Sequence, residues 1–166
     1  MNRTVFEPCV TIDTSDTLSG DLALPVQVVD RRDKKLRDAL CYHDPTTQYV
    51  IRKKRHLALV SLGDLFVAVR GYAPTIEEIY DRAALKGLRK PPSYSGIFFL
   101  VQNPHCLKNL GLSSCLIGSE PFTGSDGHSY IPQISSQGKL YLRARKADES
   151  VKWGPDERWL FETTAK

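Results

Sequence analysis

A histidine and an aspartate stand two residues apart in the glycine-rich segment 123–129 (TGSDGHS). An imidazole titrates near neutral pH, and a carboxylate can orient it or take a proton, so this pair has the side chains of a general acid–base site. The glycines also permit a tight turn whose successive backbone amides could bind an anion. The spacing does not match the phosphate-binding loop GxxxxGKS/T. We interpret the segment first as a turn, and a small hydrolase-like site using Asp126 and His128 is the alternative.

Four consecutive cations, Arg52, Lys53, Lys54 and Arg55, form a basic run. Such a run can contact phosphates, and the release of counterions would make this binding fall steeply with salt. If the run is a β-strand, its side chains alternate between two faces, so one continuous cationic surface requires a loop or an exposed edge strand. Charged edge strands also protect a sheet from pairing with other chains. A solvated edge or loop is the first interpretation of the basic run, and binding of an anion or a nucleic acid is the second.

Cysteines and histidines also occur near one another in the sequence, as Cys41 with His43 and as His105 with Cys106. If the fold brought these groups together with Cys115, they could bind zinc, or a cysteine beside a histidine could act as a nucleophile. The sequence contains no CxxC pair or other standard metal-binding spacing. Unpaired cysteines commonly pack as small apolar groups. We therefore expect reduced, mostly buried thiols, with no metal and no cofactor.

Two tryptophans stand near the C-terminus. Trp159 shares one strand face with Phe161, so we expect both side chains to close the hydrophobic core. Trp153 precedes a Gly-Pro pair, which favours a loop, and exposed aromatic residues are enriched at the centres of protein interfaces. Trp153 is therefore the candidate contact for a partner.

The composition is that of one ordinary globular domain. The chain has 166 residues, of which 41% are hydrophobic and 25% are charged, and a domain of this length can bury a sizeable core. The net charge of +4 gives a mildly basic surface, which favours anionic partners only slightly. No apolar stretch approaches the roughly 20 residues that span a bilayer, and the N-terminus lacks the basic start and apolar run of a secretory signal. We expect a single cytoplasmic domain over residues 1–166 with no membrane partner, and the turn-rich segment 1–30 is open to a peripheral placement.

The hydrophobic pattern places the candidate residues on an α+β fold. Thr75 and Glu78 have the spacing of a capping box, and the apolar residues that follow share one face, so we expect an amphipathic helix over residues 75–86. A shorter amphipathic helix is expected over residues 33–41. Short apolar runs bounded by turn-forming residues predict strands at residues 57–62, 65–69, 97–101, 114–117, 130–134, 140–144 and 158–162. We expect these strands to form a mostly antiparallel sheet.

Four of these segments together resemble small bacterial and phage proteins of uncharacterised function. They are segment 75–83 (TIEEIYDRA), Gly87 with Leu88, segment 125–127 (SDG) and segment 153–161 (WGPDERWLF). The resemblance covers residues 57–162. Its motifs are a helix cap, a helix stop, a turn and a closing aromatic strand, which are structural signals. The resemblance therefore implies a bacterial or phage setting and no activity.

The leading functional prediction is a small, non-enzymatic binding module with a mildly basic surface, whose ligand is a protein or a nucleic acid. The basic run and Trp153 are its candidate contacts. The alternative is a hydrolase-like enzyme using Asp126 and His128. That enzyme would require the two side chains to meet each other or a cysteine inside a concave pocket, and this geometry separates the two predictions.

Overall fold

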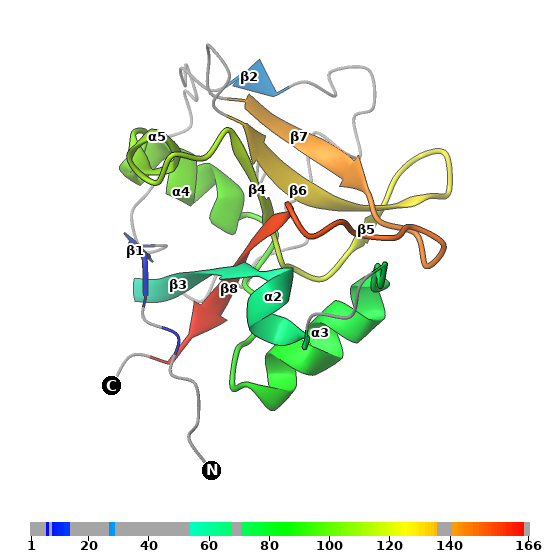
Figure 1. The fold of residues 1–166 in the computed structure, drawn as a ribbon. Coiled ribbons are helices and arrows are strands. Elements are labelled where there is room, and N and C mark those ends of the chain that lie inside the picture. The colour runs from blue at the N-terminus through cyan, green and yellow to red at the C-terminus, as the bar shows by residue number, and fades with distance from the viewer. Residues whose placement is uncertain are drawn as a thin grey trace.

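The structure of the chain is a computed structural model, which describes residue 6 and residues 8–13, 27–28, 54–67, 71–135 and 141–164. These residues form a curled mixed sheet with helices on both of its faces (Figure 1). The α+β class expected from the sequence is confirmed. No helix in this part of the chain is long and apolar enough to cross a membrane.

The sheet has eight strands in the order β1-β3-β8-β4-β6-β7-β2, and β5 pairs with β6. The strands are β1 (Val10–Asp13), β2 (Gln27–Val28), β3 (Lys54–Ser61), β4 (Ser114–Ile117), β5 (Phe122–Thr123), β6 (Ser129–Ser135), β7 (Tyr141–Lys146) and β8 (Arg158–Thr163). The pairs β4–β8 and β2–β7 are parallel, and the other pairs are antiparallel. The sheet is therefore mixed, whereas the sequence pattern predicts a mostly antiparallel one.

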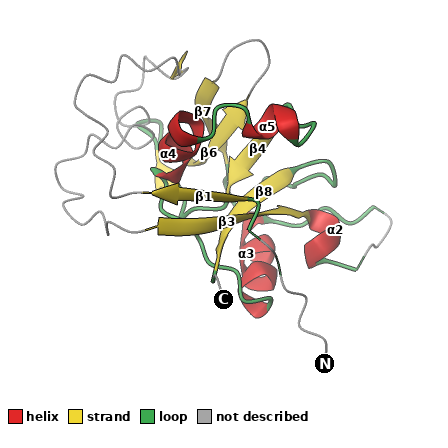
Figure 2. Cartoon of the chain, turned by 90° about the vertical axis from the view of Figure 1, so that its left-hand side faces the viewer, coloured by secondary structure: helices red, strands yellow, loops and turns green. Residues whose placement is uncertain are grey.

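Strand β8 lies in the middle of the sheet, and its side chains enter two separate cores. Successive side chains of a strand point to opposite faces, so Trp159 and Phe161 share one face of β8. On that face they pack with helices α2 (Leu62–Leu65) and α3 (Ile76–Leu85). Leu160 packs on the other face with α4 (Ser95–Gln102) and α5 (Cys106–Asn109). Figure 2 shows α2 and α3 on one side of β3 and β8, and α4 and α5 on the other.

Helix α3 begins where the capping-box spacing places it. The backbone N–H of Glu78 donates to the Thr75 hydroxyl at 3.3 Å, and the Glu78 carboxylate accepts the backbone N–H of Thr75 at 2.7 Å. These bonds satisfy two donors that have no partner within the helix. The helix ends at Leu85, and Gly87 then adopts a φ of 81°, which glycine reaches without steric cost. Among the described residues α3 is one of four short helices.

Residues 97–101 belong to helix α4, so the strand predicted there is wrong. Every side chain of this run whose burial the structure describes is nearly inaccessible to solvent, namely Phe98, Phe99 and Leu100. A short, continuously apolar run lacks the polar positions that would separate a helical period from a strand period. Gly96 lets the helix approach the sheet, since an added Cβ would lie 3.2 Å from the Leu142 side chain.

The strand predicted at residues 65–69 is likewise absent from the described part of that range. The preceding strand β3 ends at Ser61, where a second capping box opens the one-turn helix α2: the Ser61 hydroxyl and the Asp64 carboxylate exchange bonds with each other's backbone N–H groups. Leu65 is the last residue of that helix. The S-x-x-D spacing of Ser61 and Asp64 is a sequence signal for the start of a helix. The apolar residues on both sides of it favoured strands instead.

Several predictions fall outside the described residues. They are the helix at residues 33–41, the cations Arg52 and Lys53, and the thiol and imidazole of Cys41 and His43. Most of segment 1–30 also lies there.

Candidate functional site

The turn at residues 123–129 forms as predicted, and Asp126 stabilises it. One carboxylate oxygen of Asp126 accepts the backbone N–H of His128 at 3.1 Å, and the other accepts the Tyr130 hydroxyl at 2.6 Å. These two bonds lower the pKa of Asp126, with the Tyr130 hydroxyl as the larger cause. Gly127 has a φ of 81°, as a turn of this kind requires. Asp126 thus bonds the backbone of His128, and its role is that of a turn residue.

The imidazole of His128 is bonded instead by Asp148, which follows β7. The Nδ1 atom of His128 lies 2.9 Å from Oδ2 of Asp148, and its Nε2 atom lies 3.3 Å from Nζ of Lys146. Oδ1 of Asp148 accepts the backbone N–H of Ser129 at 2.8 Å, and this bond is the main cause of the lowered pKa of Asp148. The His128 side chain is 46% exposed, so water screens its interactions strongly. We call Asp126, His128, Tyr130, Lys146 and Asp148 the rim cluster.

The two described members of the basic run have different surroundings. Lys54 is exposed at the start of β3. Arg55 is buried, and its guanidinium bonds the Glu162 carboxylate at 2.7 Å. The alternation of β3 explains the difference, because adjacent side chains point to opposite faces. Arg55 is therefore an internal ion-pair residue, and its place among the predicted anion contacts is corrected.

Trp153 is a core residue, so its predicted role as an exposed partner contact is also corrected. Only 1% of it is accessible to solvent. Its ring meets that of Trp159 edge-on, with the ring centroids 4.9 Å apart, and the guanidinium of Arg145 lies 5.7 Å from its centroid. The backbone N–H of Trp153 also donates to the carbonyl of Pro74. The segment before β8 therefore closes one of the two cores.

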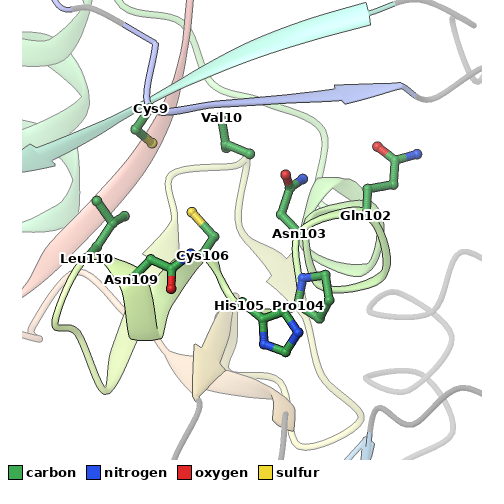
Figure 3. A pocket seen from close by; sticks show the side chains of 9 residues that line it. All are labelled: Cys9, Val10, Gln102, Asn103, Pro104, His105, Cys106, Asn109 and Leu110. Carbon is green, nitrogen blue, oxygen red and sulfur yellow. The ribbon is translucent and has the colours of Figure 1, made fainter.

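A groove of about 420 Å³ lies between β1 and the segment that joins α4 to α5 (Figure 3). This volume falls within the roughly 300–1,000 Å³ typical of ligand pockets. Its lining residues are Cys9, Val10, Gln102, Asn103, Pro104, His105, Cys106, Asn109 and Leu110. Figure 3 shows Cys9, Cys106 and Asn109 at one end and Gln102 and Asn103 at the other. The lining contains three carboxamides and no Lys, Arg, Asp or Glu, so it suits an uncharged ligand that forms hydrogen bonds.

Gln102 fixes one wall of the groove to the sheet. Its side-chain Oε1 accepts the backbone N–H of Asp13 at 2.7 Å, and its Nε2 donates to the carbonyl of Asp13 at 2.9 Å. The amide therefore bonds β1 as the backbone of a neighbouring strand would. These two bonds hold the end of α4 against the outer side of β1.

Asn103, the next residue, has an unsatisfied donor. Its Nδ2 atom is buried and has no hydrogen-bond partner among the residues that the structure describes. A buried donor without a partner costs about 1–3 kcal/mol. A rotation of the amide toward the groove would let a ligand carbonyl supply the missing acceptor. Asn103 is thus a residue of the groove whose amide nitrogen lacks an acceptor among the described residues.

The thiols of the groove are poor nucleophiles. Burial raises the pKa of Cys9 to about 11, with a further contribution from Cys106, and burial also raises the pKa of Cys106. Both thiols are therefore protonated near neutral pH, whereas catalytic cysteines have lowered pKa values. The described residues contain no group of three or more His, Cys, Asp or Glu side chains that could hold a metal ion. The groove is thus suited to binding rather than to covalent catalysis.

The sequence interpretation did not select Gln102, Asn103 or Asp148. Asp148 stands 20 residues from its partner His128, so only the pairing of β6 with β7 brings them together. Asn103 opens the polar stretch Asn-Pro-His-Cys after an apolar run, which is a weak signal for the end of a buried element.

Comparison with known proteins finds no matching family model, no matching curated protein and no matching solved structure.

Proposed function

We propose that this protein is a non-enzymatic binding module, and that its groove binds an extended, uncharged segment of a partner protein. The observation that carries this proposal is the unsatisfied Nδ2 of Asn103: the residue lines the groove, and this buried nitrogen has no acceptor among the described residues. A peptide carbonyl is the commonest uncharged acceptor that a partner protein offers. Asn109 and His105 line the same groove and can bond further backbone groups.

The lining favours a peptide over a nucleic acid. Nucleic-acid binding draws most of its affinity from Lys and Arg contacts to phosphates. The groove has neither residue in its lining, and Arg55 is already paired with Glu162 inside the protein. An uncharged peptide needs no cation for binding in such a groove, whereas a phosphate would lose its hydration without a Lys or Arg to compensate its charge. We also expect the cytoplasmic location and the bacterial or phage setting predicted from the sequence.

The test is a screen of short, uncharged peptides immobilised on an array, followed by fluorescence anisotropy with the strongest binders. Asn103→Ala removes the unsatisfied donor, so we expect affinity to fall about tenfold, the value of one hydrogen bond, while the free energy of unfolding stays unchanged or rises. Lys108→Ala is the matched control, because Lys108 is exposed on α5 but does not line the groove. We expect this control to bind like the parent protein.

Two results would contradict the proposal. One is a set of peptides whose binding is the same in the parent protein and in Asn103→Ala. The other is tighter binding of single-stranded oligodeoxythymidine than of any peptide, with an affinity that falls steeply as salt is added. The second result would show that the ligand is a nucleic acid.

The hydrolase-like alternative has one observation in its favour, the bond between His128 and Asp148. A carboxylate on Nδ1 orients an imidazole as a general base requires. Asp148 would then take the role that the sequence interpretation gave to Asp126. Hydrolysis of p-nitrophenyl acetate by the parent protein and by His128→Ala tests this alternative, and equal rates would exclude it.

A further inference from the structure

Two thiols line the same end of the groove from different parts of the fold. Cys9 directly precedes β1, where its backbone N–H donates to the carbonyl of Leu57. Cys106 is the first residue of α5. Both cysteines are free, and both side chains contribute to the groove lining. Figure 3 shows their sulfur atoms pointing toward one another across the groove.

The electrostatics of the two thiols agree with this proximity. Burial is the main cause of the raised pKa of Cys9, and the charge of a nearby Cys106 thiolate raises this pKa further. Cys115 interacts with both of them, but it is fully buried in β4 and does not line the groove. Cys9 and Cys106 line the groove whereas Cys115 is fully buried, so a small oxidant that enters the groove reaches these two residues and not the third.

We propose that Cys9 and Cys106 form a reversible disulfide that closes one end of the groove. A disulfide requires the two Cα atoms to lie within about 7 Å of each other. The bond would therefore hold β1 against the start of α5. Cys9 directly precedes β1 and Cys106 begins α5, so the approach moves residues at the ends of two elements.

Peroxide is the class of oxidant that we assign to this reaction. The thiolate of one cysteine attacks a peroxide oxygen and breaks the O–O bond, which gives a sulfenic acid and a hydroxide that becomes water on protonation. The second sulfur then attacks the sulfenic sulfur, forms the S–S bond and releases a second hydroxide, which is also protonated. Two thiols and one hydrogen peroxide thus give one disulfide and two waters. Because the attacking species is the thiolate, the reaction quickens as the pH rises toward the raised thiol pKa.

The experiment treats the full chain with hydrogen peroxide, blocks the remaining thiols with N-ethylmaleimide and identifies linked peptides by mass spectrometry. Before the thiols are blocked, we expect the mass of the monomer to fall by about 2 Da, for the two hydrogens lost, and to return after dithiothreitol. We expect one linked pair of peptides, containing Cys9 and Cys106. Cys9→Ser and Cys106→Ser should each abolish it, and the control Cys41→Ser should keep it.

The proposal is overturned if the oxidised chain retains both groove thiols, if the linked peptides contain Cys41 or Cys115, or if the disulfide joins two chains. This readout uses no ligand, so it stands apart from the proposed peptide binding. The regulatory consequence rests on that function: we expect the oxidised protein to bind the selected peptides at least about tenfold more weakly than the reduced protein. A disulfide without any effect on peptide affinity would remove the regulatory role and leave the modification site.

Discussion

Asp148 bonds two groups at the start of β6 at the same time. Its Oδ2 lies 2.9 Å from Nδ1 of His128, and its Oδ1 accepts the backbone N–H of Ser129 at 2.8 Å. These bonds join the turn before β6 to the residues that follow β7. Lys146 completes the contact, with its Nζ 3.4 Å from the same Oδ2. The rim cluster therefore joins the segment before β6 to the segment after β7, at one end of this strand pair.

This arrangement predicts a loss of stability in acid that depends on Asp148. Its pKa in the folded protein is lowered from 3.8. A lowered carboxylate pKa contributes stability that is present above the unfolded pKa and is lost as the pH falls through the folded pKa. Asp148→Asn removes this contribution, so we expect its urea midpoint to fall less between about pH 7 and about pH 3 than that of the parent protein.

Asp81→Asn, an exposed change on α3, is the control for this measurement. Its urea midpoint should follow that of the parent protein across the pH range. An Asp148→Asn variant with the pH response of the parent protein would show that the bonds of Asp148 add nothing to stability.

The ion pair of Arg55 and Glu162 makes the second prediction. The two side chains are only 6% and 13% exposed, so each partner compensates a charge that water barely reaches. Glu162→Gln leaves the guanidinium buried and without its counter-charge, and we expect the free energy of unfolding to fall by about 3 kcal/mol. The double variant Arg55→Met with Glu162→Leu should recover much of this loss. Urea denaturation of the three proteins measures both effects, and a loss below about 0.5 kcal/mol in Glu162→Gln would contradict the internal role of Arg55.

Local signals predicted the elements whose ends are marked by side-chain chemistry. The capping box at Thr75 and Glu78 marks the start of α3, because the bonds it forms join residues three apart. The apolar run at residues 97–101 has no such mark, and its helical form depends on burial against both the sheet and its neighbours. The sequence pattern also did not predict the parallel pairing of β4 with β8, since 40 residues separate the two strands.

The candidate site was less predictable because each of its residues owes its role to distant partners. Arg55 and Trp153 have side chains that occur both at the surface and inside, and the sequence around them favours exposure. Glu162 and Trp159, contributed by β8, bury them. His128 lies in the predicted turn, whereas only the pairing of β6 with β7 brings its partner Asp148 to it.

The burial of Trp153 predicts a large effect on stability. Its ring packs against Trp159 and has almost no exposed surface, so Trp153→Ala leaves a cavity in the core. We expect the free energy of unfolding to fall by about 3–5 kcal/mol. Lys152→Ala, at the exposed neighbouring position, should change it by less than about 0.5 kcal/mol. Thermal unfolding monitored by circular dichroism measures both effects. Equally small effects of the two changes would contradict the burial of Trp153 in the core.

Gly118 lies so close to the Phe161 ring of the same core that replacing it with alanine should destabilise the protein. A Cβ added at Gly118 would lie 2.4 Å from Cε1 of the Phe161 ring, well inside the sum of the atomic radii. That ring is fully buried and packed against Tyr80 and Trp159, so it has no free space to move into. We expect Gly118→Ala to lower the free energy of unfolding by about 1–3 kcal/mol.

Two further variants show whether the Phe161 ring is the cause. Adding Phe161→Leu to Gly118→Ala should cost less than the sum of the two single changes, because the smaller side chain makes room for the methyl group. Gly63→Ala in α2 is the matched control: its added Cβ meets nothing closer than 3.6 Å, and alanine favours a helix over glycine by about 1 kcal/mol. Urea denaturation should therefore show opposite signs for the two Gly→Ala changes. If Gly118→Ala were as stable as the parent protein, the close packing of β8 against the end of β4 would be wrong.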